Sequence, residues 1–270
     1  MEPTLTDIPE TMLWTLHNRA SESLRPDGMM KDPHAERIYR AIRYDYLRRF
    51  GPSDASHAVR SMIFDEAVQP WMLQHPGGTV VELGSGLETQ FQRVDDGQVR
   101  WLCVDVPEAL DIRERFLPAG GRCHHLRLSA FDTTWIDEVD TSLGVFITAQ
   151  GLFMYFEEAQ VQELVVTIME RLPGVEIMFD TIPLWLSRKS MTGYWRTPYY
   201  RTPPMPWGIN LWDVPERVKS WSPLVTRVEV LPYRRFRTFP AMLAPWFARL
   251  PGLKQHVPGN VRVYTRAVGK

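Results

Sequence analysis

The chain has 270 residues, of which 44% are hydrophobic and 23% are charged, and its formal net charge at pH 7 is −1. This composition is typical of a globular protein and leaves no overall basic field for holding nucleic acid. No stretch approaches the roughly 18 apolar residues of a membrane span, and the first residues lack the basic and apolar regions of a signal peptide. We therefore expect a cytoplasmic protein that neither crosses a membrane nor binds nucleic acid.

Residues 1–75 are expected to form a helical N-terminal extension. Apolar residues recur there at spacings near 3.6, the period of an α-helix. The last of these helices is predicted over residues 60–73, and the turn-forming run Pro76-Gly77-Gly78 follows it as a stop signal.

Residues 76–180 alternate between strand-like and helical segments. The predicted strands cover residues 79–83, 99–105, 124–128, 142–148 and 175–179. An amphipathic helix is predicted over residues 157–171, between the last two strands. This alternation indicates a parallel sheet with helices on both faces, which we expect to be the cofactor-binding core.

Residues 181–223 break this alternation and are rich in proline and tryptophan. We predict an ordered insertion that lies over the active site and is neither disordered nor a regular helix, because disordered segments are poor in aromatic residues. Residues 224–270 are expected to contribute two strands, 225–231 and 261–267, that pair as an antiparallel edge. The four segments together are interpreted as one domain.

The two cysteines of the chain, Cys103 and Cys123, lie in or beside strand-like apolar segments. We interpret them as buried, reduced thiols, which is the usual state of cysteines in cytoplasmic proteins. The linear spacing of cysteines and histidines shows no ligand motif, so no metal site is expected.

A glycine turn follows the first predicted strand. The run Glu82-Leu83-Gly84-Ser85-Gly86 ends this strand and is expected to open a helix, and its glycines let the backbone approach a ligand closely. The second strand ends in Asp105, about 20 residues later, where a carboxylate can accept hydrogen bonds from both hydroxyls of a ribose. The pattern predicts a cofactor site at this turn.

The turn is poorly suited to a dinucleotide. The G-x-G-x-x-G fingerprint requires a glycine at position 89, which is Thr89, and Glu82 adds negative charge where a pyrophosphate would lie. A carboxylate there suits a ligand with a cationic amino group and no phosphates, which favours S-adenosyl-L-methionine. An NAD-dependent dehydrogenase is a more distant alternative.

Several motifs resemble those of the leucine carboxyl methyltransferase superfamily. They are residues 80–89, residues 101–107 with Arg113, residues 129–135, residues 151–155, and Asn18-Arg19-Ala20 followed by Asp32-Pro33. The resemblance extends over about residues 12 to 180, and within the superfamily it is stronger to bacterial polyketide O-methyltransferases of the tetracenomycin type. It implies a class I, Rossmann-like α/β fold with a mostly parallel seven-stranded sheet whose last strand is antiparallel.

The resemblance implies roles for residues at the methionine end of the cofactor. Arg60 would pair with the methionine carboxylate. Gly84 and Gly86 would lie against the methionine moiety, with Glu82 nearby. Gln150 stands where the family usually has a glutamate before Gly-Leu, so this position keeps hydrogen-bonding ability but loses a charge.

The resemblance also implies roles at the adenosine end. Asp105, with Val106 beside it, would hold the ribose, and Ala130 and Phe131 would flank the adenine. Gln90 replaces the arginine of the family's usual Asp-Thr-Arg run. Two residues before it, Glu88 is interpreted as a solvated charge near a helix N-terminus, where the helix dipole favours it.

The acceptor site is expected in the insertion. No Asp or Glu occurs from residue 181 to residue 211, whereas several cations and aromatic residues do. Aromatic rings form flat apolar walls, and arginine can bind a carboxylate through two hydrogen bonds. The residues expected to contact the acceptor are Tyr155, Trp195, Arg196, Arg201 and Trp207. None of the histidines lies in a recognisable catalytic motif, so no general base is named.

These observations predict an S-adenosyl-L-methionine-dependent O-methyltransferase. Its acceptor would be a hydroxyl or carboxylate of a small molecule, such as a polyketide or another secondary metabolite. Two alternatives stay open: methylation of the C-terminal carboxylate of a peptide or protein, and a methyltransferase-like binding protein without activity. The chain is expected to act as a monomer or a homodimer.

Overall fold

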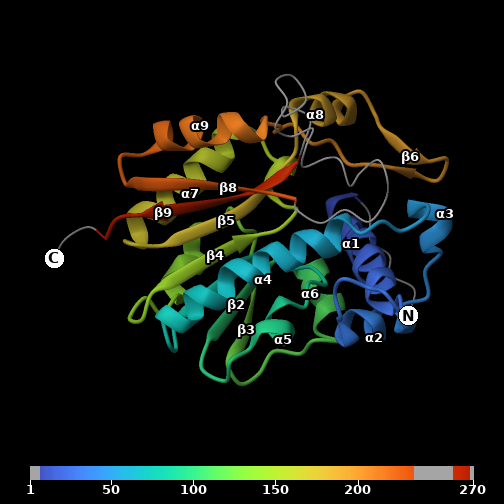
Figure 1. Cartoon of the computed structure of the whole chain (residues 1–270), viewed down its shortest axis with the longest axis horizontal. Coiled ribbons are helices and arrows are strands. Elements are labelled where there is room, and N and C mark those ends of the chain that lie inside the picture. Colours follow the sequence, from blue (N-terminus) through green and yellow to red (C-terminus); the bar gives the residue numbers. More distant parts are fainter. Residues whose placement is uncertain (1–6, 234–257, 268–270) are drawn as a thin grey trace.

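The computed structural model describes residues 7–233 and 258–267. Its central element is a seven-stranded sheet in the order β3-β2-β1-β4-β5-β9-β8 (Figure 1). The strands are β1 (Thr79–Leu83), β2 (Arg100–Asp105), β3 (Cys123–Arg127), β4 (Val145–Ala149), β5 (Glu176–Thr181), β8 (Val225–Pro232) and β9 (Gly259–Thr265). The strands β1 to β5 run parallel, and β9 is antiparallel to both β5 and β8. The expected sheet, with its antiparallel edge, is confirmed.

Consecutive residues of the central strands face opposite layers of the molecule. Val81 of β1 packs toward α7 (Glu158–Arg171), whereas Val80 packs toward α4 (Ser56–Gln74). Side chains alternate along a strand, so a strand that is covered on both faces must be apolar at successive positions. This explains the continuous apolar runs in the sequence, and α4 and α7 confirm the helices predicted over residues 60–73 and 157–171.

Three further helices precede α4: α1 (Asp7–Leu24), α2 (Pro33–Ala41) and α3 (Tyr46–Phe50). They share a core cluster to which Leu13, Leu16 and Ile38 contribute. The N-cap of α2 is Asp32, whose carboxylate accepts a hydrogen bond from the backbone N–H of Ala35 at 2.8 Å.

The helix expected to open at the glycine turn is short and begins later than predicted. This helix, α5 (Gln90–Val94), has five residues. The chain before it is irregular because Gly84 and Gly86 have positive φ angles of 65° and 44°, which a right-handed helix does not allow. The next helix along the chain is α6 (Pro107–Arg113), and two short 3-10 helices follow, η1 (Thr133–Glu138) and η2 (Phe153–Tyr155).

The insertion contains regular helices, which corrects the expectation for residues 181–223. It folds as α8 (Leu184–Met191), β6 (Trp195–Thr197), β7 (Tyr200–Arg201), η3 (Leu211–Asp213) and α9 (Val214–Trp221). Two of its prolines occupy helix starts: Pro183 is the N-cap of α8, and Pro215 lies in the first turn of α9. Proline is tolerated there because those backbone N–H groups have no partner within the helix.

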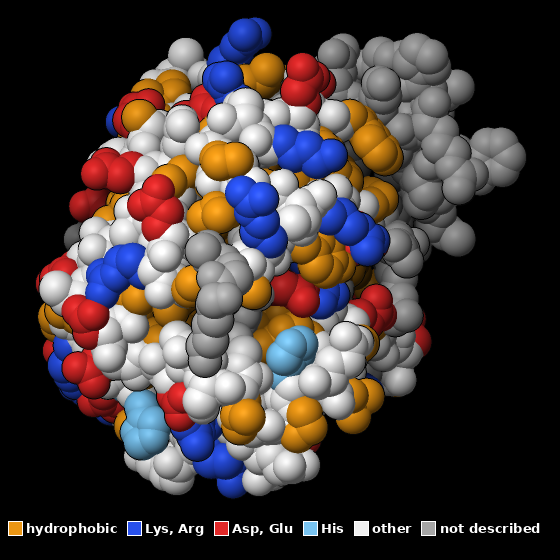
Figure 2. Space-filling model, turned by 90° about the vertical axis from the view of Figure 1, so that its left-hand side faces the viewer, with side chains coloured by type: hydrophobic (Ala, Val, Ile, Leu, Met, Phe, Trp, Pro, Cys, Tyr) orange, Lys and Arg blue, Asp and Glu red, His pale blue; other side chains and the backbone are white. Residues whose placement is uncertain are grey.

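Figure 2 shows acidic and basic side chains interspersed on one face of the molecule, as the small net charge leads one to expect. Among the described residues, no helix combines the length and the apolar character needed to cross a lipid bilayer.

Candidate active site

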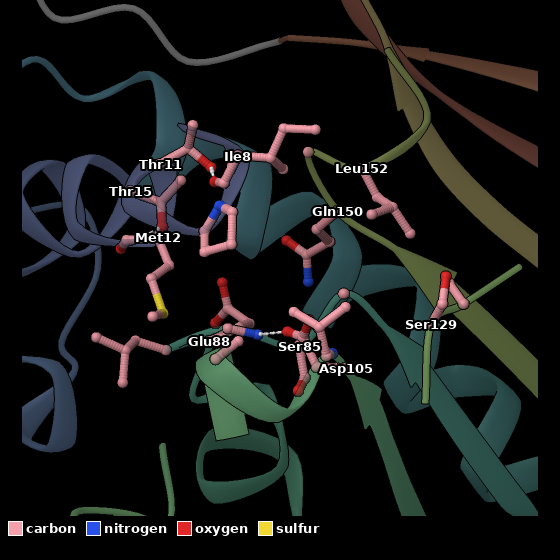
Figure 3. Close-up of a pocket in the computed structure, with 18 of the residues that line it drawn as sticks. Ile8, Thr11, Met12, Thr15, Ser85, Glu88, Asp105, Ser129, Gln150 and Leu152 are labelled. Atoms are coloured by element: carbon pink, nitrogen blue, oxygen red, sulfur yellow. Dashed lines mark hydrogen bonds between the residues drawn. The ribbon is translucent and has the colours of Figure 1, made fainter. Parts of the chain in front are cut away.

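A cavity of about 240 Å³ lies where the carboxyl ends of β1, β2 and β4 meet α1. On the side of the sheet it is lined by residues 84–88, Asp105, Ala130 and Gln150. Figure 3 shows Ser85, Asp105 and Gln150 opposite Met12 of α1. Ligands of open α/β sheets bind at this edge, because the loops that follow parallel strands converge there. The cavity therefore contains the glycine turn and the terminal aspartate that the sequence singled out.

The carboxylate of Asp105 is hydrogen-bonded to the backbone of the glycine turn. Its Oδ2 accepts a hydrogen bond from the backbone N–H of Gly86 at 2.7 Å, and its Oδ1 accepts one from that of Val106 at 2.8 Å. Burial raises the pKa of this carboxyl, and the two backbone donors oppose that shift. A carboxylate has about four lone-pair positions, so the side chain retains capacity for further hydrogen-bond donors such as ribose hydroxyls.

Gly86 is required by its conformation and by its neighbour. Its φ angle is +44°, and a Cβ at this position would lie 3.0 Å from Cβ of Met12. We expect Gly86→Ala to destabilise the fold by about 1–3 kcal/mol and to weaken cofactor binding, because α1 must move away from the turn. Chemical denaturation and calorimetry with S-adenosylhomocysteine measure the two effects.

Gly97 is a matched control for this prediction. Its φ angle is +81°, but a Cβ there would meet nothing within 4 Å. Gly97→Ala should therefore cost stability through backbone strain alone and leave cofactor affinity unchanged. Equal affinities of the Gly86 and Gly97 variants for S-adenosylhomocysteine would contradict the role assigned to the contact between the turn and α1.

The structure does not bring Glu82 to the cavity. Glu82 is 1% exposed and its side chain lies within the protein, where Oε2 accepts a hydrogen bond from Nε1 of Trp101 at 3.1 Å. Burial raises the pKa of this carboxyl well above its usual value, although Arg113 lies 3.8 Å away. Alternation along β1 places this side chain on the sheet face where it contacts Trp101 and Cys103 of β2, so Glu82 is not placed to meet a cationic amino group in the cavity.

Unpaired buried acceptor atoms lie instead on Gln150 and Ser85. The Nε2 of Gln150 donates to Oε1 of Gln90 at 3.3 Å, which fixes the amide. The Oε1 of Gln150 and the Oγ of Ser85 are buried without a hydrogen-bond partner among the described residues. Both residues line the cavity, and buried unpaired polar atoms of this kind suit a ligand with an ammonium group (Figure 3).

Arg60 lines the cavity and is held by a carboxylate that the sequence analysis missed. Its Nη1 donates to Oδ2 of Asp180 at 2.9 Å, and Oδ1 of Asp180 accepts from the backbone N–H of Gly151 at 2.6 Å. The Nε of Arg60 has no partner among the described residues. Asp180 lies near the carboxyl end of β5, at the same sheet edge as Asp105. An acidic residue at the end of this predicted strand is the sequence feature that could have identified it.

Glu88 is not a solvated charge, which corrects the expectation for it. It is 8% exposed and receives hydrogen bonds from Arg19 at 2.9 Å, Arg93 at 2.6 Å and Ser61 at 2.9 Å. Burial opposes ionisation, but the two arginines hold the pKa of this carboxyl below its usual value. Asp32, 3.2 Å from Arg19, joins the same buried cluster, so two distant sequence motifs meet at the cofactor turn.

At the other end of the cavity, the lining combines Ser129 with apolar side chains. Ala130 lines the cavity directly. Phe156 also lines the cavity. Phe131 does not line it, but the ring of Phe131 packs on that of Phe156 with 4.0 Å between the ring centroids. This end can accommodate a flat heterocycle such as adenine.

A second cavity of about 530 Å³ adjoins the first. The two share Thr11, Thr15, Arg60 and Gly151 in their linings. Of the residues expected to contact the acceptor, the structure brings only Tyr155 to this cavity.

The other four predicted acceptor residues line neither cavity. Arg196 binds the protein itself: its Nε donates to the carbonyl of Phe50 at 2.7 Å, and its guanidinium lies 4.3 Å from the centre of the Trp14 ring. Trp207 is a core residue. Its ring packs against aromatic rings from segments that precede it and from one that follows it in the chain. Trp195 and Arg201 are exposed on the β6–β7 hairpin. Charge and aromaticity in the sequence could not distinguish contacts with the rest of the chain from contacts with a ligand.

Comparisons with known proteins agree with this geometry. The family model for leucine carboxyl methyltransferase matches residues 12–169. The tetracenomycin polyketide synthesis O-methyltransferase TcmP of Streptomyces glaucescens is 31% identical over 187 residues, which cover 68% of this chain and 69% of that protein. The S-adenosyl-L-methionine-dependent methyltransferase dpfgK of Gibberella zeae is 27% identical over 199 residues, which cover 66% and 67% of the two chains.

Solved structures share the fold. The plantazolicin methyltransferase BpumL in complex with SAH superposes with a TM-score of 0.51 and 11% identity, covering 95% of this chain and 98% of that chain. A SAM-dependent methyltransferase from Anabaena variabilis gives a TM-score of 0.50 and 11% identity, covering 77% and 85% of the two chains. The expected Rossmann-like methyltransferase fold and the expected cofactor are thus confirmed. The chain belongs to the leucine carboxyl methyltransferase family and is an S-adenosyl-L-methionine-dependent methyltransferase.

Proposed function

We propose that this methyltransferase methylates a hydroxyl group of a small aromatic acceptor that occupies the second cavity. The observation that carries this proposal is the junction of the two cavities at Arg60, Gly151 and two threonines of α1. A cofactor in the first cavity and an acceptor in the second would meet there, as an in-line methyl transfer requires.

The lining of the second cavity favours a flat, largely apolar acceptor. It includes the aromatic or apolar side chains of Trp14, Met154, Tyr155, Ile182, Leu186, Tyr194, Met205 and Tyr233. Aromatic walls bind planar rings through stacked and edge contacts. The relative from Streptomyces glaucescens, which is described as an O-methyltransferase of polyketide synthesis, supports an acceptor of this kind.

The charges of the second cavity favour a hydroxyl acceptor over a carboxylate. Its described cations are Arg25 and Arg60, and each is paired with an aspartate, Asp27 at 3.1 Å and Asp180 at 2.9 Å. Three carboxylates, those of Glu22, Asp54 and Asp180, also line the cavity. A buried anion needs a partner of opposite charge. In the complex proposed here Arg60 faces the methionine carboxylate, and Arg25 is exposed and paired with Asp27, so neither cation is left for a carboxylate acceptor.

In the first cavity, we propose that Arg60 receives the methionine carboxylate and that Oε1 of Gln150 receives the ammonium group. Asp105 would bind the ribose hydroxyls, and Ala130 would contact the adenine. When bound, S-adenosyl-L-methionine would supply a methyl group on its sulfonium: the acceptor oxygen would bond to the methyl carbon, the carbon–sulfur bond would break to leave a neutral thioether, and the hydroxyl proton would be lost to solvent. The protein contributes alignment of the two ligands and exclusion of water.

We assign His57 to orient the acceptor hydroxyl. It lines the second cavity, and its Nδ1 lies 2.9 Å from the amide Nδ2 of Asn18, which donates to it. Nδ1 is therefore the acceptor, and the neutral ring carries its proton on Nε2. Burial and the nearby Arg60 lower the pKa of His57 to about 3, so the ring stays neutral and can donate a hydrogen bond to the acceptor oxygen.

This pKa has a consequence for stability. Below the ordinary histidine pKa of 6.5 the unfolded chain gains a proton that folded His57 does not, so unfolding becomes easier as the pH falls from 6.5 toward 3. In His57→Gln this part of the pH dependence should disappear, whereas in His124→Gln, on the exposed surface, it should persist. Urea unfolding at a series of pH values measures the slopes; equal slopes in wild type and His57→Gln would refute the shift.

The acceptor is tested with the purified chain, S-adenosyl-L-methionine and three classes of candidate: polycyclic phenols, aromatic carboxylates without hydroxyls, and peptides with a free C-terminus. We expect methylation of phenols. Met205→Trp, which fills only the second cavity, should raise the KM for the acceptor without changing affinity for S-adenosylhomocysteine, and Trp195→Ala should change neither. Methylation of carboxylates or peptides but not phenols would overturn the proposal.

We also propose that residues 1–270 act as one methyltransferase domain in the cytoplasm. The second cavity draws on residues from the N-terminal extension, the core, the insertion and the C-terminal segment, which include Trp14, Asp180, Met205 and Tyr233. Both cysteines are buried and unbridged, as is usual in a reducing compartment. Limited proteolysis should therefore release no stable subfragment that still binds S-adenosylhomocysteine.

A further inference from the structure

Three donor atoms of the kind that bind soft metals meet within the sheet, outside both cavities. The Sγ atoms of Cys103 and Cys123 are 4.0 Å apart, and Nε2 of His125 is 4.0 Å from Sγ of Cys123. All three atoms lie within 4.8 Å of one another. Atoms bound to one metal ion at 2.0–2.3 Å lie at roughly such separations, so only small side-chain movements are needed to close the site.

The pairing of β2 with β3 creates this cluster. Cys103 pairs with His125 and Trp101 pairs with Cys123 in the parallel register. Residues two apart on a strand share a face, so Cys123 and His125 point to the same side, toward Cys103. The linear spacing of these residues resembles no metal motif, which is why the sequence analysis expected no metal.

The histidine is in the tautomer that a metal needs. Its Nδ1 lies 3.4 Å from the carboxylate of Glu114, which can only accept, so Nδ1 carries the proton. The lone pair of Nε2 then faces Cys123. A carboxylate behind a ligating histidine is the usual arrangement that orients the ring and strengthens it as a ligand.

We propose that Cys103, Cys123 and His125 form a three-coordinate binding site for a soft monovalent cation, Cu(I). Thiolates and imidazole are the ligands that Cu(I) favours. Zinc prefers four ligands. Among the described residues, Oε2 of Glu82 lies 3.6 Å from Sγ of Cys103, but Glu82 is not part of the group whose donor atoms all lie within 4.8 Å of one another.

Charge also favours a monovalent ion. Binding releases the two thiol protons, so two thiolates, neutral imidazole and Cu(I) carry a net charge of −1. The guanidinium of Arg113, whose Nη2 lies 3.3 Å from Sγ of Cys103, is the positive charge beside the site, and it also faces Oε2 of Glu82, which lies 3.8 Å from Arg113 and 3.6 Å from Sγ of Cys103. A buried charge is tolerated when it is paired in this way.

Arg113 connects this site to the cofactor turn. Its Nη1 donates to the carbonyl oxygens of Gly86 at 3.0 Å and Glu88 at 2.7 Å. The proposed ion would therefore lie one side chain away from the backbone that lines the cofactor cavity.

The test is an anaerobic titration in which the protein competes with bicinchoninate for Cu(I), followed through the absorbance of the bicinchoninate complex. We expect the protein to withdraw about one Cu(I) per chain. Because the chain contains only two cysteines, X-ray absorption of the loaded wild-type protein should show two sulfur ligands and one nitrogen ligand. This second measurement does not depend on the folding of any variant.

Variants assign the ligands. Cys103→Ser and Cys123→Ser should each abolish the withdrawal of Cu(I), and Glu114→Gln should weaken binding by about tenfold or more through its effect on His125. His124→Gln, at the exposed neighbouring position of β3, is the matched control and should bind as wild type does. Binding of S-adenosylhomocysteine and the thermal unfolding midpoint confirm that each variant is folded.

Three results would overturn the proposal. The first is that the wild-type protein fails to compete with bicinchoninate for Cu(I). The second is that the double variant Cys103→Ser/Cys123→Ser binds Cu(I) with the affinity of the wild type. The third is that the X-ray absorption spectrum shows fewer than two sulfur ligands.

Discussion

Arg60→Met should weaken binding of S-adenosylhomocysteine by about two orders of magnitude, because the loss of one partner of a buried, hydrogen-bonded charge pair costs roughly 2–5 kcal/mol. Arg60 is 5% exposed, lines the first cavity and retains an unpartnered Nε among the described residues. In the proposed complex its guanidinium meets the methionine carboxylate. Calorimetry with S-adenosylhomocysteine measures the loss.

The same substitution leaves Asp180 buried without its cation. This should destabilise the fold by about 3–5 kcal/mol, as the breaking of buried ion pairs does. Adding Asp180→Asn removes the unpaired charge and should restore much of the stability but none of the affinity, because the amide cannot bind a carboxylate as arginine does. Wild-type affinity in Arg60→Met, or recovery of affinity in the double variant, would refute the role of Arg60 in binding the cofactor.

The second large effect is expected at Arg19. Arg19 is fully buried, and its Nη1 lies 3.2 Å from Asp32 and 2.9 Å from Glu88. Its Nη2 also donates to the carbonyl of Leu87 at 2.6 Å. Arg19→Met removes a cation shared by two buried carboxylates, so we expect a loss of about 3–5 kcal/mol in the free energy of unfolding. Guanidinium chloride denaturation with a constant m-value measures it.

Arg122→Met is the matched control for Arg19→Met. Arg122 also pairs with a carboxylate, Asp95, at 2.7 Å, but the two side chains are 38% and 30% exposed. Solvent screens such pairs, so the loss should stay within about 1 kcal/mol. A similar loss in both variants would mean that the buried cluster around Glu88 contributes no more than a surface pair.

Three side chains have partners in the structure that the sequence did not indicate. Glu88, Arg196 and Trp207 were judged by residue type, and each type is compatible with more than one partner. Glu88 meets two arginines from distant parts of the chain, Arg196 binds the carbonyl of Phe50, and Trp207 packs in the core. Burial and pairing depend on contacts between segments far apart in the sequence, which local patterns do not contain.

The sequence by itself determined the features that depend on local periodicity and turn chemistry. Alternating strands and helices, the glycine turn and Asp105 at the end of β2 follow from side-chain alternation, helical spacing and the freedom of glycine at positive φ. These features were enough to predict the sheet and the edge at which the cofactor binds.

Only the tertiary structure decided which side chains face that edge. The pairing of β1 with β2 placed Glu82 beside Trp101, and the approach of α4 to the carboxyl end of β5 paired Arg60 with Asp180. The register of β2 with β3 likewise brought Cys103 beside Cys123 and His125. Each of these results depends on the relative placement of elements that are separated in the chain, because a charge or a thiol acquires its partner only when the whole sheet has formed.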